Sequence, residues 1–289
     1  MTAVLGIGNA TLDIIHQVDC YPNENDEIRC SNRLQRCGGN TANTLIVLSQ
    51  LGVDCGWAGT LVADSDGRRV ADGLSRQGVD VSAAQWFDSG SMPVSSVLIS
   101  KQTGSRTITH FRDLPEYPVA AFEALELQSY DWLHFEARNV VSIRQMLASV
   151  RQRTMQLRCS LEVEKPREGI ESLFPLVDVL LFSRHYALSR GFTDPLALLR
   201  SVHKVCPGVD LFCAWGEQGA AALDHAGTEY RHAAVIPSRV VDTLGAGDTF
   251  NAGIINGYLK ALAIDESLAR ACQLAGNKCG QDGLDGITA

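Results

Sequence analysis

One segment near the end of the chain combines closely spaced glycines with carboxylates, a pattern that suits phosphoryl transfer. It runs from Asp242 to Asn251 and reads Asp-Thr-Leu-Gly-Ala-Gly-Asp-Thr-Phe-Asn. Gly245 and Gly247 allow close approach to the backbone, and the predicted helix that follows presents unpaired N–H groups and the positive end of its dipole. Together these groups can form an anion hole for phosphoryl oxygens.

Asp248 lies at the start of that predicted helix, and two interpretations of its carboxylate are open. In the first, the carboxylate accepts the proton of a hydroxyl group while the hydroxyl oxygen attacks phosphorus. In the second, Asp248 is an ordinary helix N-cap and the two glycines beside it form a tight turn. The segment alone does not distinguish a general base from a cap.

Other nucleotide and nucleophile motifs are absent from the sequence. No G-x-x-x-x-G-K-[ST] is present, and Gly6-Ile-Gly8 lacks the third glycine of a dinucleotide-binding fingerprint. The H-R-D and D-F-G elements of protein kinases are missing, and so is G-x-S-x-G. P-loop enzymes, dinucleotide enzymes and protein kinases are therefore excluded.

Polar residues follow the short apolar runs of the chain, where ligands bind in open α/β sheets. These groups are Asn9 with Asp13, Glu136-Ala-Arg138-Asn139, Glu162-Val-Glu164-Lys165, Ser183-Arg184 and Gly216-Glu217. Any single one of them is more often structural than catalytic. Their convergence on one edge of a sheet predicts a binding site there.

The elements that position these groups alternate between strands and helices. Apolar runs predict strands at Val4–Ile7, Cys55–Ala58, Trp132–Phe135, Leu157–Val163, Val179–Phe182 and Leu211–Trp215. Helical spacing predicts helices at Asn40–Leu51, Arg69–Gln77, Ser142–Val150, Asp248–Leu262 and Asp265–Cys279. This alternation predicts an α/β fold, with a mainly parallel sheet covered by helices on both faces.

Two stretches break this rhythm, at about 13–37 and 92–113, and the second contains the turn Thr103-Gly-Ser105. Their alternating apolar and polar residues predict exposed strands in a small side sheet, which we interpret as a lid. No internal repeat or Pro/Gly-rich linker divides the chain. We therefore expect one domain over 1–289.

Composition narrows the range of partners. The 289 residues carry a net charge of −8 without a Lys/Arg run, so a nucleic-acid surface is not expected. No apolar segment is long enough to span a membrane, and no basic signal region precedes Arg29, so we expect a cytoplasmic protein. Nine cysteines without a C-x-x-C pair indicate free thiols rather than a disulfide framework or zinc site.

Two signatures together resemble the ribokinase-like (PfkB) carbohydrate kinases. They are Gly38-Gly-Asn-Thr-Ala-Asn43 near the N-terminus and the segment from Asp242 to Asn251. The resemblance covers essentially the whole chain and is strongest to the ketohexokinase subgroup. It implies a three-layer ribokinase-like fold with a small β-sheet lid. It also implies ATP-dependent phosphorylation of fructose or a similar ketose at O1, which gives the ketose 1-phosphate and ADP.

The resemblance implies a role for each residue that matches the family's motifs. The sugar-binding positions correspond to Asp13, Gly39, Asn40 and Asn43, whose carboxylate and amide groups suit hydroxyls that both donate and accept hydrogen bonds. The catalytic base corresponds to Asp248, and the anion hole corresponds to Gly245, Ala246 and Gly247. For Asn40 and Asn43, capping of the following helix stays open as an alternative.

ATP-binding positions are implied in three further places. The loop that receives ATP corresponds to Gly216, Glu217 and Gly219, and a lid residue that reaches the phosphates corresponds to Arg106. In the last predicted helix, the residues that share one face and could border the adenine are Cys272, Gly276 and Cys279. The structural alternatives are a solvated hairpin arginine and a helix face that packs against the sheet.

The implied metals are Mg²⁺, which enters with ATP and is held mainly through phosphates and waters, and K⁺ at the Asp242 carboxylate. One departure concerns magnesium. Many relatives carry Asn-x-x-Glu after a central strand, whereas this chain reads Ser183-Arg-His-Tyr186, as the ketohexokinase subgroup does. Which carboxylate orders the magnesium shell stays open, and Glu217 is one candidate.

Alternatives to a ketose kinase are a family kinase for another sugar, a sugar acid or a nucleoside, and a non-catalytic sugar or nucleotide sensor on the same fold. The expected partners are a small-molecule sugar, ATP and a second copy of the chain. Pairing of lid strands between two copies predicts a homodimer in which Asp26 or Glu27 lies near the partner's sugar site.

Overall fold

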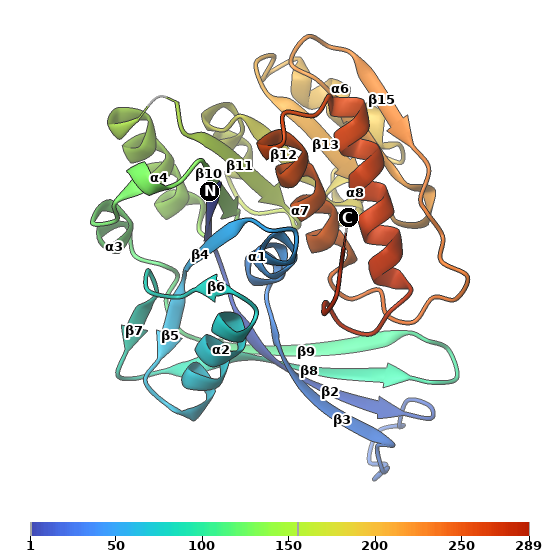
Figure 1. Cartoon of the computed structure of the whole chain (residues 1–289). Helices are drawn as coiled ribbons and strands as arrows, with labels where there is room; N and C mark the ends of the chain where they lie inside the picture. Colours follow the sequence, from blue (N-terminus) through green and yellow to red (C-terminus); the bar gives the residue numbers. More distant parts are fainter. Residues whose placement is uncertain (1, 155, 289) are drawn as a thin grey trace.

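Buried apolar runs build a large central sheet in the computed structural model, which describes residues 2–154 and 156–288 (Figure 1). In spatial order the sheet comprises β15 (Glu229–His232), β14 (Ala220–Leu223), β13 (Asp210–Ala214), β12 (Val179–Phe182), β11 (Arg158–Val163), β10 (Trp132–Glu136), β1 (Ala3–Ile7), β4 (Asp54–Ala58) and β6 (Val79–Asp80). The strands from β13 to β6 are parallel, and β14 and β15 continue one edge antiparallel. The predicted mainly parallel sheet is confirmed.

Helices cover both faces of this sheet because successive strand residues point to opposite sides. Leu5 of β1 belongs to one buried cluster and its neighbour Val4 to the other. The first cluster includes side chains from α3 (Val119–Glu123), α4 (Val140–Arg153), α5 (Arg184–Ser189), α6 (Pro195–His203), η1 (Leu127–Ser129) and η2 (Ile170–Leu176). The second includes side chains from α1 (Asn40–Gln50), α2 (Ser65–Arg76), α7 (Ala246–Leu259) and α8 (Ile264–Cys279).

A separate small sheet lies below the large one in the view of Figure 1. Its strands, in order, are β3 (Asn32–Gly38), β2 (Thr11–Val18), β8 (Ser91–Ser100) and β9 (Arg106–Asp113). These strands fall within or at the edges of the two stretches, about 13–37 and 92–113, that interrupt the alternation of strands and helices. The predicted small sheet is therefore confirmed. A short pairing of β5 (Thr60–Val62) with β7 (Gln85–Phe87) lies beside it.

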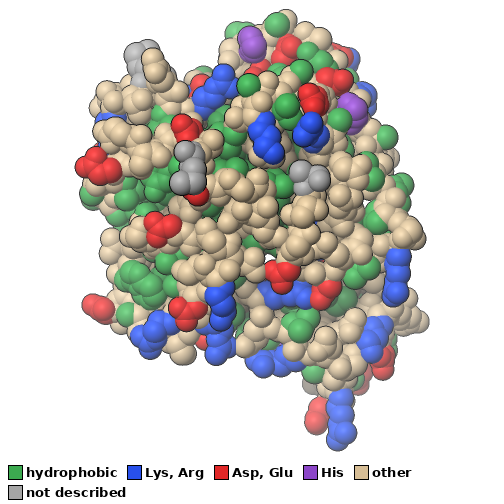
Figure 2. All heavy atoms as spheres, viewed as in Figure 1, with side chains coloured by type: hydrophobic (Ala, Val, Ile, Leu, Met, Phe, Trp, Pro, Cys, Tyr) green, Lys and Arg blue, Asp and Glu red, His purple; other side chains and the backbone are tan. Residues whose placement is uncertain are grey.

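The surface of the small sheet is polar on the face shown in Figure 2, where Lys and Arg side chains gather with some Asp and Glu among them. Its edge strand β9 is exposed along almost its whole length. The turn between β8 and β9 contains Gly104, whose φ of 67° suits glycine, and its N–H donates to the Ser100 carbonyl at 2.8 Å. That this sheet closes as a lid, and that 1–289 acts as one domain, stay predictions.

Two helix N-termini meet the carboxyl ends of the central strands. Figure 1 shows α1 and α7 side by side, and contacts between the two helices agree with this view. Helix α7 begins at Ala246, two residues earlier than expected, so Asp248 lies inside its first turn. Within the described ranges, no helix is long and apolar enough to cross a membrane.

Candidate active site

The N-terminus of α7 is left open by its sequence. Its N-cap is Gly245, which has a φ of 82° and no side chain with which to cap the helix. Helix α2 shows the contrast, because the Asp64 carboxylate accepts the N–H groups of Asp66 and Gly67 there. The N–H groups of Gly247 and Asp248 have no hydrogen-bond partner among the described residues, whereas the Ala246 N–H donates to the Thr243 carbonyl at 3.4 Å. The two unpartnered groups stay available to an anionic ligand, which is the arrangement that an anion hole requires.

Asp248 points from this first turn into the protein and does not cap the helix. Its side chain accepts a 2.7 Å hydrogen bond from Asn43 Nδ2, and the residue is only 8% exposed. Burial raises the pKa of Asp248 to about 8, against the lowering effect of the Asn43 amide, and the nearby carboxylate of Glu164 raises it further. A carboxylate that titrates near neutral pH is matched to accepting a hydroxyl proton.

The two asparagines of α1 each donate to a buried carboxyl group rather than to the end of their own helix. The N-cap position of α1 is Gly39, whose φ of 105° is rarely adopted by residues with side chains. Asn40 Nδ2 donates to Glu162 Oε1 at 3.2 Å, while Asn43 donates to Asp248. The helix-capping alternative for these asparagines is therefore wrong.

A cavity of about 340 Å³ lies on the Asn43 side of these groups, and neither Asn40 nor Asp248 is among the residues that line it. Asp13 and Asn43 line it, together with Leu244 from the anion-hole loop. The Asp13 carboxylate accepts a 2.7 Å hydrogen bond from Thr11 Oγ1. The volume is within the range of small-molecule pockets, and the lining carboxylate and amide suit hydroxyl groups.

Sequence reasoning noted Glu136 and Glu162 only as strand-end groups and gave them no role. The two residues are register partners on β10 and β11, and both are buried. Glu162 Oε1 also accepts a 3.1 Å bond from Asn251 Nδ2, so this carboxyl joins α1, β11 and α7. Burial, and then the nearby Asp248, raise the pKa of Glu162 well above its ordinary value. Strand-end position was the signal that could have assigned them.

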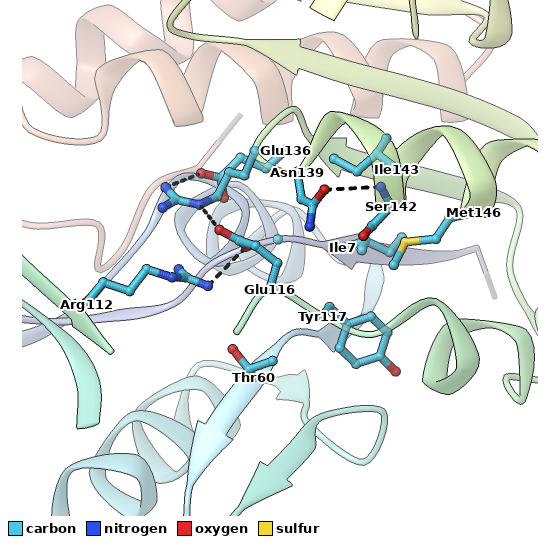
Figure 3. Close-up of a pocket in the computed structure, with 12 residues that line it drawn as sticks. Ile7, Thr60, Arg112, Glu116, Tyr117, Glu136, Asn139, Ser142, Ile143 and Met146 are labelled. Carbon is cyan, nitrogen blue, oxygen red and sulfur yellow. Dashed lines mark hydrogen bonds and ion pairs between the residues drawn. The ribbon is translucent and has the colours of Figure 1, made fainter. Parts of the chain in front are cut away.

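A smaller recess, of about 20 Å³, lies at the end of β1 and is lined by charged side chains (Figure 3). Arg112 Nη2 lies 3.0 Å from Glu116 Oε2, and Arg138 Nε donates to Glu116 Oε1 at 3.1 Å. Arg112 also donates to Asn9 Oδ1 at 2.7 Å, which joins the last residues of β9 to the segment just after β1. The recess has room for about one water, so it is a structural junction rather than a second binding site.

Among the predicted ATP residues, Arg106 reaches the anion-hole loop. It projects from the exposed strand β9, and its Nη1 donates to Thr243 Oγ1 at 3.1 Å. Gly216 lies in the short helix η3 (Gly216–Gln218) between β13 and β14. Gly219 has a φ of 92°, and a Cβ there would overlap the His232 carbonyl, so only glycine fits this turn. Glu217 is exposed on η3, and no hydrogen bond within the described ranges joins it to Asp248.

The three predicted residues of α8 are buried or half-buried, and they pack against two different parts of the chain. Gly276 packs so closely on the segment before α7 that a Cβ would overlap the Val235 carbonyl oxygen. Cys279 is half-buried, and its carbonyl accepts the Val241 N–H at 2.8 Å. Cys272 is buried within the second apolar cluster. The packing interpretation therefore holds for Cys272, whereas Gly276 and Cys279 border the segment that leads into the anion hole.

Asp242, the position expected for K⁺, is already paired with a cation of the chain. Lys278 Nζ donates to Asp242 Oδ2 at 2.8 Å and to the Asp242 carbonyl at 2.9 Å. The carboxylate expected to hold K⁺ is therefore already paired with an ammonium of the chain, so the side chains here do not fit K⁺. Across the residues that the structure describes, no group of three or more His, Cys, Asp or Glu could hold a metal ion.

Comparison with known proteins shows the family. The chain matches the pfkB family of carbohydrate kinases over residues 1–287. It belongs to that family. It is 38% identical to ketohexokinase of Mus musculus, with 98% of each chain covered. Aminoimidazole riboside kinase of Salmonella typhimurium is 24% identical, over 97% of this chain and 88% of that protein.

Solved structures show the same fold at lower identity. The ribokinase of Arabidopsis thaliana, in complex with ribose and ATP, superposes with a TM-score of 0.77 at 19% identity, over 98% of this chain and 93% of that one. The adenosine kinase of Sinorhizobium meliloti gives a TM-score of 0.79 at 20% identity, over 98% and 95%. The predicted ribokinase-like fold is confirmed, and the PfkB chain is a phosphotransferase that acts on a carbohydrate.

Proposed function

We propose that this PfkB kinase transfers the γ-phosphoryl group of ATP to O1 of fructose or a similar ketose. The observation that carries the proposal is the Asn43–Asp248 pair, which presents a buried carboxylate of raised pKa beside a cavity of about 340 Å³ and an open helix N-terminus. The 38% identity to mouse ketohexokinase supports a ketose as the acceptor.

In the proposed reaction, the sugar lies in the cavity against Asp13 and Asn43 and extends toward Asn40, which does not itself line the cavity. Asp248 accepts the proton of the attacking hydroxyl, and the Asn43 amide holds the carboxylate in place through its 2.7 Å bond. The backbone N–H groups at 245–247 face the phosphoryl oxygens as negative charge develops on them. This arrangement provides general-base and electrostatic catalysis without a covalent intermediate.

ATP is proposed to lie along the segment before α7 and the loop at Gly216–Gly219. Arg106 already contacts Thr243 of the anion-hole loop, so a small movement of β9 brings its guanidinium to the phosphates. Mg²⁺ bound to ATP would neutralise part of the phosphate charge. Closure of the small sheet would exclude water from the sugar.

We further propose a homodimer through the small sheet. Its edge strand β9 is unusually exposed and carries two apolar residues, Ile108 and Phe111, of which Phe111 is 58% exposed. A second copy would cover this edge and bring its own Asp26 and Glu27 toward the sugar site.

The test of the main proposal is ATP-dependent ADP release with six acceptors, followed by NMR of the product. The acceptors are fructose, tagatose, ribose, fructose 6-phosphate, 2-keto-3-deoxygluconate and adenosine. We expect a ketose 1-phosphate from fructose or tagatose. Turnover with another acceptor alone would overturn the substrate and keep the fold and Asp248. A chain that binds sugar and ATP without turnover would be a sensor.

A further inference from the structure

A lysine ammonium lies at Asp242, the residue at which the resemblance to PfkB kinases predicts a potassium ion. Lys278 is in the last turn of α8, and its side chain is 0% exposed, which is rare for lysine. Its Nζ donates to two oxygens of a single residue, the side-chain Oδ2 and the main-chain carbonyl of Asp242. A fixed positive charge is therefore held against both oxygens.

The remaining contacts of Asp242 show that this ammonium organises the loop before the anion hole. Asp242 Oδ1 accepts the Leu244 N–H at 2.8 Å, and Oδ2 accepts the Gly283 N–H at 3.2 Å. Arg36 Nη1 lies 3.7 Å from the same Oδ2 on the solvent side. Burial alone would raise the pKa of Asp242, but these bonds, led by that from Lys278, hold it below its ordinary value. The carboxylate is thus ionised and neutralised from within the chain.

We propose that the Lys278 ammonium replaces the monovalent cation beside the anion hole, so that this kinase needs no added K⁺. An ammonium and a potassium ion carry the same charge and both require oxygen partners. A second cation at the same pair of partly buried oxygens would be repelled by the Lys278 ammonium, whose side chain is fully buried. The proposal concerns the ion requirement rather than the acceptor, and so goes beyond the proposed function.

The first experiment uses the unmodified protein, exchanged into tetramethylammonium chloride and then titrated with KCl at constant ionic strength. We expect the melting temperature to change by less than about 2 °C, because no site becomes filled. Sugar-dependent ADP release should change by less than about twofold, a small fraction of the tenfold that 1.4 kcal/mol represents. A saturable rise of melting temperature or rate with KCl, absent with NaCl, would overturn the proposal.

The second experiment removes the ammonium with Lys278→Ala, which takes from the partly buried Asp242 carboxylate its strongest cationic partner. We expect a lower melting temperature in tetramethylammonium buffer and a partial recovery with KCl or NH₄Cl that the unmodified protein does not show. The matched control is Lys204→Ala, which removes an exposed lysine next to α6 and should not respond to either salt. A Lys278→Ala protein that no monovalent cation stabilises would contradict the proposal.

If the Lys278→Ala protein does not fold, two other measurements still test the proposal. The titration of the unmodified protein stands by itself, and the paired variant Lys278→Met with Asp242→Asn removes both charges and should fold without any response to KCl. A KCl response of the paired variant would place the cation elsewhere and refute the proposal. Because melting is measured without substrate, failure to phosphorylate a ketose leaves these results interpretable.

Discussion

Replacing Asp248 with asparagine should stabilise the unliganded protein while strongly slowing phosphoryl transfer. Burial raises the pKa of this carboxyl from 3.8 to about 8, so the folded state favours the protonated form. As pH rises from about 4 to 8, the unfolded chain releases the proton and the folded chain retains it, so stability falls. Asp248→Asn removes this cost and keeps an oxygen to accept the Asn43 amide.

The magnitude follows from the two pKa values. At 1.36 kcal/mol per pH unit, the difference corresponds to roughly 2 kcal/mol at about pH 5.5 and roughly 5 kcal/mol at about pH 8.5. The gain in unfolding free energy from Asp248→Asn should therefore grow by about 3 kcal/mol between these pH values. Loss of the general base should lower kcat by about 10³-fold.

Denaturant unfolding of the unliganded proteins at both pH values measures the first effect, and ADP release with fructose measures the second. The control is Asp88→Asn on the exposed loop before β8, which should change neither quantity. A stability difference that does not grow with pH would show that Asp248 is already ionised without cost. A variant that keeps its rate would show that another group accepts the proton.

Three further variants test the parts around Asp248. A Cβ at Gly247 meets no heavy atom within 4 Å in the described part of the chain. Gly247→Ala should therefore change the unfolding free energy by less than about 1 kcal/mol. It should lower kcat at least about tenfold, because the added methyl group obstructs the phosphoryl group. Arg106→Ala should raise the KM for ATP about tenfold. The control Arg33→Ala, on β3 at the opposite edge of the same sheet, should not change it. Phe111→Glu should lower the molar mass measured by light scattering from that of a dimer to that of a single chain. A monomeric unmodified protein would contradict the proposed dimer. A Gly247→Ala enzyme of full activity would contradict the proposed anion hole.

The central strands could be predicted from the sequence because they are buried on both faces and read as continuous apolar runs. Apolar runs do not identify the strands at or near the edges of the central sheet. β14 is the short run Ala220–Leu223, in which three alanines carry little strand preference, and β6 has only two residues. These strands exist because they pair with β13 and β4, which is tertiary context that no local pattern contains.

The anion hole could also be predicted, because it depends on glycines and a helix start within a few residues of one another. The partners of its carboxylates could not. Glu162 meets Asn40 and Asn251 across 122 and 89 residues, and only the sheet brings them together. The capping interpretation of Asn40 was plausible locally and fails because Gly39 occupies the N-cap position and Asn40 is the first residue of the helix.

Lys278 shows where a finer analysis of helical spacing would have succeeded. It follows Ala271 by seven residues and Leu274 by four, so it lies on the buried stripe of α8 rather than on its solvent face. A lysine on an apolar stripe must either reach solvent or find an anion, since an unpaired buried ammonium is costly. Asp242, the carboxylate just before the anion hole, is that anion. The Lys278–Asp242 pair therefore both allows α8 to pack and orders the loop before the anion hole. For this reason, the response to K⁺ and the melting temperature should change together when Lys278 is replaced.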